Sequence, residues 1–298
     1  MKYNQLGKSD LHVSEIGFGC MSLAGDESES VKLLQEAFSE GINYFDTADL
    51  YDKGENEKIV GRALKGIREK VYLGTKVGNQ RRKDGSGWDW NPSKKYILTA
   101  VEGSLKRLQT DYIDLYQLHG GTIDDPIDET IEAFEILKQQ GKIRFYGISS
   151  IRPEVIREYI KRSAIVSVMM QYGLLDRRPE ESCLDLLEKN KIGVFARGVL
   201  AKGLLVNKNP VPFLSYSFDE VQNAADAIKA VAGNTRSATE TAIRYVFHQP
   251  AVSAAIIGVR TRQQLKEACA IAGSRPLSDT EIQKLKHSVK IIQYEQFR

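Results

Sequence analysis

Short apolar runs alternate with longer amphipathic runs about eight times along the 298 residues, and this alternation constrains the fold more than any other feature. The short runs are rich in β-branched and aromatic residues and mostly do not alternate polar with apolar positions. That pattern is typical of parallel strands buried on both faces. The predicted strands are residues 15–19, 43–46, 71–76, 113–119, 143–149, 166–171, 192–197 and 254–258.

Segments with helical spacing lie between these strands. In the first of them Val31, Leu34 and Phe38 fall on one stripe, and Gly41 follows as a stop signal. Strand–helix alternation repeated in this way favours a closed (β/α)8 TIM barrel, an α/β fold, over an open sheet. The chain length suits one such barrel, so we expect a single domain over residues 1–298. The predicted helices are residues 30–40, 91–108, 128–140, one opening at 152–154, 179–190, 238–247 and 261–271.

Three segments lie outside the repeat. Residues 3–6 and 11–13 flank a Gly-Lys-Ser-Asp turn and predict an N-terminal β-hairpin, which could plug the bottom of the barrel. Residues 207–217 carry two prolines and several aromatics, which indicates a long loop of a kind that is often functional. An extra helix at residues 279–292 is expected near the C-terminal end.

Composition excludes several classes of protein. Basic residues exceed acidic residues by 42 − 39 = 3, which is too small an excess to argue for nucleic acid or an anionic membrane as a partner. Cys20, Cys183 and Cys269 are far apart, so we expect no disulfide framework, no metal site and a reducing compartment. Met1–Asp10 lacks a signal-peptide core, and no apolar run reaches the roughly 18–20 residues that cross a bilayer. We therefore expect a cytoplasmic protein.

Titratable side chains end three successive predicted strands. Asp46, Lys76 and His119 stand at the strand ends, and Tyr51 follows Asp46 in a loop. Active residues of such barrels gather at the C-terminal ends of the strands. Each residue also has an ordinary explanation: a turn cap, a solvated strand end, a satisfied buried histidine or packing at the rim. A lysine in a buried strand is costly without a partner, however, and Asp46 is the natural one.

Four sequence blocks together resemble the aldo-keto reductase superfamily, in the right order and over essentially the whole chain. This resemblance implies a (β/α)8 barrel with NADPH lying across its C-terminal face and reduction of a small-molecule carbonyl, an aldehyde or ketone, to an alcohol. The matching blocks are residues 41–51 (GINYFDTADLY), 73–76 (LGTK), 111–119 (DYIDLYQLH) and 141–149 (GKIRFYGIS).

The resemblance also implies a catalytic tetrad. Tyr51 matches the general acid, Lys76 the lysine beside it, Asp46 the aspartate that pairs with that lysine, and His119 the histidine that orients the substrate carbonyl. Hydride arrival builds negative charge on the carbonyl oxygen, so donors must be aimed there beforehand. A nearby ammonium favours the phenolate and is expected to make Tyr51 a better acid. His119 would be most useful as a neutral donor.

The cofactor site must be built without a Rossmann motif, because no Gly-x-Gly-x-x-Gly follows the first strand. The resemblance implies loop contacts to the ribose and nicotinamide, the carboxamide, the pyrophosphate and, at a helix N-terminus, the 2′-phosphate that favours NADPH over NADH. In that order, the implied residues are Gly19, Cys20, Met21 and Asp46; Ser149, Ser150 and Gln171; Arg197, Gly198, Val199, Leu200 and Lys202; and Gly258, Arg260, Thr261 and Gln264. Arg262 is the alternative to Arg260.

Three positions depart from the family pattern. Arg197 stands where many relatives have an aromatic that stacks on the nicotinamide, and a guanidinium there adds charge. Ser150 stands where Asn is frequent, and Ala268 where Asn often contacts adenine. These departures leave open which contacts the three residues make with the cofactor.

The sequence leaves alternatives for both the substrate and the functional class. Trp88 and Trp90 can wall a pocket for an apolar aldehyde beside His119, or they can pack on the scaffold. A second hypothesis is an NADPH-binding regulatory subunit, because the potassium-channel beta subunits resemble this family. A third is a barrel isomerase or hydrolase that uses the Asp, His and Lys without a nucleotide. A monomer is the default expectation.

Overall fold

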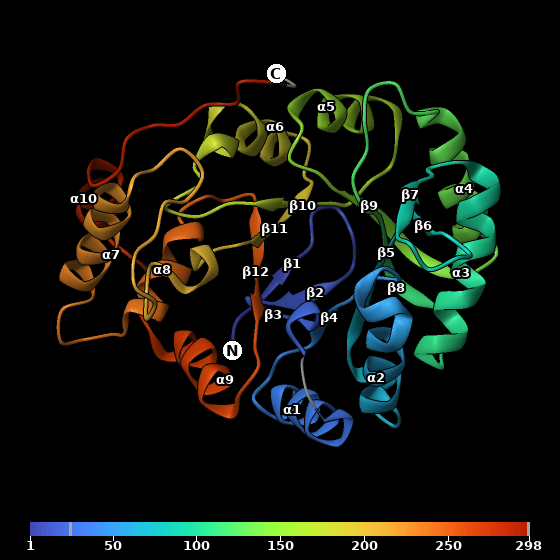
Figure 1. Cartoon of the computed structure of the whole chain (residues 1–298), viewed down its shortest axis with the longest axis horizontal. Helices are drawn as coiled ribbons and strands as arrows, with labels where there is room; N and C mark the ends of the chain where they lie inside the picture. Colours follow the sequence, from blue (N-terminus) through green and yellow to red (C-terminus); the bar gives the residue numbers. More distant parts are fainter. Residues whose placement is uncertain (24–25, 297–298) are drawn as a thin grey trace.

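The computed structural model describes residues 1–23 and 26–296, and in this part of the chain the predicted strands close into a parallel barrel (Figure 1). Neighbouring strands follow the order β10-β11-β12-β3-β4-β5-β8-β9, so the first barrel strand pairs with the last. The TIM-barrel prediction is confirmed. The barrel strands are β3 (Ile16–Gly19), β4 (Tyr44–Asp46), β5 (Tyr72–Val77), β8 (Ile113–Leu118), β9 (Ile143–Ser149), β10 (Ser167–Gln171), β11 (Gly193–Arg197) and β12 (Val252–Gly258).

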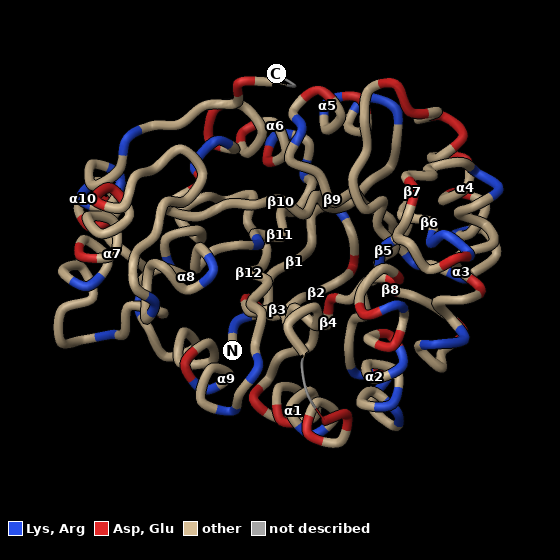
Figure 2. The backbone as a smooth tube through the Cα atoms, viewed as in Figure 1, with Lys and Arg blue, Asp and Glu red and all other residues tan. Residues whose placement is uncertain are grey.

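Helices surround the barrel (Figure 1). Their buried faces pack on the outside of the strands and form the larger of the two apolar cores. Basic and acidic residues are interspersed along the outer helices (Figure 2), and no helix of the described residues is long and apolar enough to span a bilayer. The helices are α1 (Glu27–Ser39), α2 (Glu55–Leu64), α3 (Lys94–Leu108), α4 (Ile127–Gln139), α5 (Pro153–Arg162), α6 (Cys183–Lys189), α7 (Phe218–Ala232), α8 (Ala238–Val246), α9 (Arg262–Cys269) and α10 (Asp279–His287).

Three helical details differ from the prediction. α2 and α7 were not predicted, although α7 opens with a capping box in which Ser217 and Glu220 cap each other's backbone N–H groups. α10 ends at His287 instead of residue 292. The segment after it is anchored on the 207–217 loop, where the Tyr216 hydroxyl donates to Lys290 O at 2.9 Å. That loop is irregular, as predicted.

The predicted N-terminal hairpin is present and closes one end of the barrel. β1 (Tyr3–Gln5) and β2 (His12–Ser14) pair antiparallel and lie in the middle of the ring of strands (Figure 1). Leu6, Leu11 and Val13 are fully buried and pack with side chains from inside the barrel. Gly7 has φ +55°, and a Cβ there would lie 2.4 Å from Val166 O, so the turn approaches the strands as only glycine allows.

A second hairpin, which was not predicted, lies between β5 and α3. β6 (Asn79–Arg81) and β7 (Trp88–Trp90) pair antiparallel, with Arg81 opposite Trp88 and Asn79 opposite Trp90. The hairpin carries both tryptophans to the C-terminal end of the barrel, where they help to line a cavity.

Candidate active site

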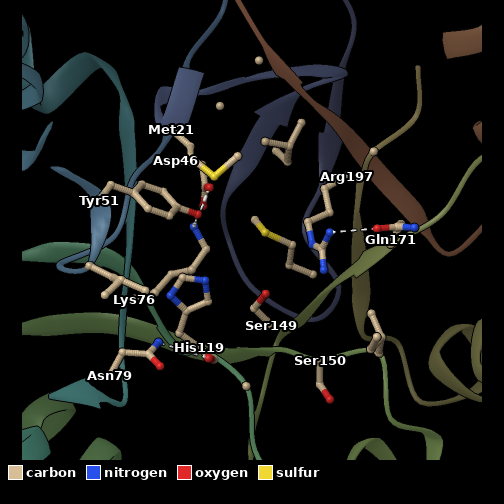
Figure 3. A pocket seen from close by; sticks show the side chains of 18 of the residues that line it. Met21, Asp46, Tyr51, Lys76, Asn79, His119, Ser149, Ser150, Gln171 and Arg197 are labelled. Carbon is tan, nitrogen blue, oxygen red and sulfur yellow. Dashed lines mark hydrogen bonds and ion pairs between the residues drawn. The ribbon is translucent and has the colours of Figure 1, made fainter. Parts of the chain in front are cut away.

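The C-terminal ends of the barrel strands surround a cavity of about 900 Å³. Polar side chains from β4, β5 and the loop after β8 lie on one side of it, and side chains from β9, β10 and β11 on the other (Figure 3). The predicted site residues that line this cavity are Gly19, Met21, Asp46, Tyr51, Lys76, Trp88, Trp90, His119, Ser149, Ser150, Gln171, Arg197, Gly198, Lys202 and Gly258.

Lys76 is the centre of the polar cluster. Its Nζ donates to Asp46 Oδ2 at 2.6 Å and to Thr47 O at 2.8 Å, and it lies 3.5 Å from the Tyr51 hydroxyl. Lys76 is fully buried and Asp46 is 4 % exposed. A charged amine in such surroundings requires a close anion, which Asp46 provides. The structure therefore brings together the ammonium, the carboxylate and the phenol that the sequence analysis singled out.

His119 completes the cluster from the loop after β8. Its ring meets the Tyr51 ring edge to face, with centroids 5.8 Å apart. His119 Nδ1 is buried and has no hydrogen-bond partner among the described residues. Because the phenol and the imidazole border the same cavity, a carbonyl oxygen placed between them could receive a hydrogen bond from each.

Burial and charge set the protonation of the pair formed by Lys76 and Tyr51. Burial lowers the pKa of Lys76, but Asp46 and Tyr51 more than offset this, so its pKa lies above its ordinary value. Burial raises the pKa of Tyr51, and Lys76 opposes this rise without cancelling it. The expected acidifying influence of Lys76 is thus present, but burial outweighs it. Tyr51 keeps its proton at neutral pH.

We predict that His119 stays neutral across the working pH range. Burial, and then Lys76 and Arg197, lower its pKa from 6.5 to about 3. The pH profile of the reaction should therefore show no inflection near 6.5 from His119, and its ring resonances should not titrate there by NMR. The unfolded chain takes up this proton near 6.5 and the native state only near 3, so stability is lost as the pH falls through that window. A His119→Asn variant should lose less stability over the same window, and an equal loss in both proteins would contradict the prediction.

Local backbone geometry presents Tyr51 to the cavity. Thr47, just beyond β4, donates from Oγ1 to Asn56 Oδ1 at 2.6 Å, and Asn56 Nδ2 donates to Cys20 O at 2.8 Å. Asp52 and Lys53 then adopt left-handed φ values of 42° and 54°, which are unfavourable for residues with a side chain. This sharp turn separates Tyr51 from α2.

The opposite wall of the cavity includes polar groups from β10 and β11. Arg197 Nη1 donates to Gln171 Oε1 at 3.2 Å (Figure 3). Gln171 Nε2 in turn donates to Asp176 Oδ2 at 2.8 Å. Gly198 has φ +72° and exposes backbone at the cavity edge. Three predicted cofactor contacts, Cys20, Val199 and Leu200, are not among the described residues that line the cavity.

A smaller hollow of about 390 Å³ adjoins the N-terminus of α9. Arg260, Thr261 and Arg262 line it. Arg262 is paired with Glu36, at 2.7 Å, and with Glu29, at 3.1 Å. Arg260 forms no ion pair within the part of the chain that the structure describes.

Gln264, a predicted cofactor contact, and Ala268, a departure from the family pattern, do not line this hollow. Gln264 instead accepts a hydrogen bond from Arg260 N at 2.9 Å, so it fixes the backbone of that arginine. Ala268 is buried at 1 % exposure and faces the core. Neither residue borders the hollow in the described structure.

Several cavity residues escaped the sequence analysis. Asn79, Arg152 and Phe213 line the cavity from β6, from the loop before α5 and from the 207–217 loop. Only Phe213 lay in a segment marked as functional. Asn79 could have been found as a polar residue three positions beyond the strand-end lysine.

Comparison with known proteins agrees with this architecture. Residues 15–290 match the family model described as the Aldo/keto reductase family. The chain is 53% identical to the uncharacterized oxidoreductase YqkF of Bacillus subtilis, with 97% of each chain covered. It is 32% identical to the aldo-keto reductase YhdN of Bacillus subtilis, covering 92% of this chain and 89% of the relative. The holo form of the aldo-keto reductase AKR11C1 from Bacillus halodurans superimposes with a TM-score of 0.95 at 51% identity, covering 100% and 99%.

A closed (β/α)8 barrel with polar groups gathered around a cavity at its C-terminal face places this chain among the barrel oxidoreductases. The chain belongs to the aldo/keto reductase family. Members of this family use a nicotinamide cofactor and act on small molecules.

Proposed function

We propose that this protein reduces the carbonyl of an aldehyde or ketone to an alcohol at the expense of NADPH, with Tyr51 as the general acid. The observation that carries the proposal is that Tyr51, Lys76 and His119 converge on one cavity, with Asp46 beneath the lysine. The opposite wall supplies an amide, a guanidinium and exposed glycine backbone, which suit the amide and phosphate groups of a dinucleotide. When bound, the reduced nicotinamide supplies the hydride.

The protein's own groups handle the charge that develops on the carbonyl oxygen. Tyr51 donates its proton to that oxygen and is left as a phenolate, which the Lys76 ammonium stabilises from 3.5 Å. Asp46 keeps Lys76 charged and in place. The neutral His119 ring donates a hydrogen bond to the same oxygen and thereby orients the carbonyl.

The choice of NADPH rests on Arg260. Arg262 is occupied by Glu29 and Glu36, so Arg260 is the guanidinium left to grip a 2′-phosphate at the start of α9. We predict that Arg260→Ala raises the Kd of NADPH roughly 10- to 100-fold, the value of a charge-assisted hydrogen bond, and leaves that of NADH unchanged. The matched control, Arg262→Ala, should change the NADPH Kd by less. Unchanged Kd values for both nucleotides in Arg260→Ala would refute the assignment.

The substrate end of the cavity favours an apolar carbonyl compound. Leu50, Trp88 and Trp90 line it near Tyr51, and Trp90 is fixed by its Nε1 donating to Asp125 Oδ1 at 2.9 Å. Such a wall stabilises an apolar chain through burial, and a charged substituent would lose its hydration there. We therefore propose an apolar aldehyde as the substrate class.

A panel of aldehydes tests the function directly. The absorbance of reduced nicotinamide should fall in the presence of apolar aldehydes, and NADPH should quench the tryptophan fluorescence. Quenching without turnover of any aldehyde or ketone would instead indicate a regulatory subunit. An isomerase or hydrolase would neither bind nor consume NADPH. We further propose that residues 1–298 form one domain, with a monomer as the default state.

A further inference from the structure

Arg81 holds the backbone immediately before the proposed proton donor. Its Nη2 donates to Leu50 O at 2.6 Å and to Asp49 O at 3.0 Å, the two carbonyls that precede Tyr51. Arg81 is half-buried and makes no ion pair with a carboxylate among the described residues. In the described structure the guanidinium therefore donates its hydrogen bonds to the two carbonyls, and its charge strengthens both of them.

The loop that Arg81 holds contains strained backbone. Directly after Tyr51 the chain enters two left-handed residues, Asp52 and Lys53, and such a conformation persists only where the surrounding structure fixes it. On the side of β4, Thr47 and Asn56 anchor the loop. Lys76 holds the loop from β5 through Thr47 O and the Tyr51 hydroxyl. On the side of the β6–β7 hairpin, Arg81 holds the two residues before Tyr51, so this hairpin contributes to the position of the Tyr51 ring.

The same hairpin also forms part of the cavity wall. Arg81 is the cross-strand partner of Trp88, and Asn79, at the start of β6, is the partner of Trp90. Both tryptophans and Asn79 line the cavity. One small hairpin thus contacts the space for the substrate and the loop of the proton donor.

We propose that Arg81 is a positioning residue for the Tyr51 hydroxyl and couples the β6–β7 hairpin to proton donation. This inference rests on the proposed role of Tyr51. A displacement of about 1 Å can cost on the order of 10²-fold in rate, so the loss of both hydrogen bonds should lower kcat by roughly 10- to 100-fold. The Kd of NADPH should not change, because Arg81 is not among the residues that line the cavity or the hollow at α9.

The first test compares substitutions at two neighbouring arginines. Arg81→Met should lower kcat with an unchanged Kd of NADPH, and Arg81→Lys, which keeps one cationic donor, should recover part of the loss. Arg82→Met is the matched control, because Arg82 lies on the same hairpin but pairs with Asp89 on the surface. It should leave kcat within about twofold of the wild type, as expected for a surface ion pair. An equal loss in Arg82→Met would show that only hairpin stability matters and would overturn the proposal.

A double-mutant cycle provides the second test. If Arg81 acts through the Tyr51 hydroxyl, Arg81→Met should cost less than about twofold once Tyr51 is already Phe, as measured in single turnovers with enzyme in excess. Multiplicative losses in the double variant would overturn the proposal. Wild-type activity of Tyr51→Phe alone would instead reject the proposed function, so the two failures are distinguishable. If Arg81→Met does not fold, the cycle is run with Arg81→Lys.

Discussion

Tyr51→Phe is expected to slow carbonyl reduction by roughly 10²–10⁴-fold or more, the usual value of general acid catalysis. The substitution removes the hydroxyl that lies 3.5 Å from Lys76 Nζ, and it leaves the ring and its packing against His119 in place. Hydride transfer would then leave an alkoxide without a proton donor. Stopped-flow measurement of NADPH oxidation with an apolar aldehyde checks this prediction.

Cofactor binding serves as the control for Tyr51→Phe. The residues proposed to hold the dinucleotide lie across the cavity and at α9, so the Kd of NADPH from fluorescence quenching should remain within about threefold of the wild type. Turnover close to the wild-type rate would assign proton donation to another group.

Lys76→Met is expected to destabilise the protein by about 3–5 kcal/mol and to abolish measurable turnover, because it leaves the Asp46 carboxylate buried without a cation. Urea unfolding followed by circular dichroism measures the free energy of unfolding. The side-chain volume is nearly preserved, so the loss reports on charge and hydrogen bonding more than on packing.

A second variant separates the two consequences. Asp46→Asn combined with Lys76→Met removes both charges and should recover much of the lost stability, whereas activity should stay absent. Stability equal to the wild type in the single variant would show that Asp46 is not charged in the folded protein. Recovery of activity in the double variant would remove Lys76 from the proposed mechanism.

The sequence predicted the barrel and the convergence of Asp46, Lys76 and His119 because parallel strands end on one face. A short continuous apolar run locates its strand, and the residue at the end of the run then lies at the site. The β6–β7 hairpin has no such run: each strand has three residues, and its side chains contact segments distant in sequence, as Arg81 contacts Leu50 O and Trp90 contacts Asp125. The proposed role of Arg81 could not be predicted from the sequence, because its partners are backbone carbonyls thirty-one and thirty-two residues away.

The two arginines before and at the start of α9 show another limit of sequence reasoning. Arg260 and Arg262 are equivalent in sequence terms, and only the placement of α1 brings Glu29 and Glu36 against Arg262. Gln171 is similar, because its hydrogen bond with Arg197 depends on the register of β10 with β11. Tertiary pairing, which local patterns do not encode, decides both cases.

The N-terminal hairpin that closes one end of the barrel affects the order in which the chain folds on the ribosome. Asn4 Nδ2 donates to Ser253 O at 2.9 Å across 249 residues, and β3 pairs with β12. Asn4 and one edge of β3 therefore lack these partners until nearly the whole polypeptide has emerged. The sheet of the nascent chain therefore has an open edge at β3 through most of translation. The pairing of β3 with β12, which closes the barrel, is among the last steps of folding.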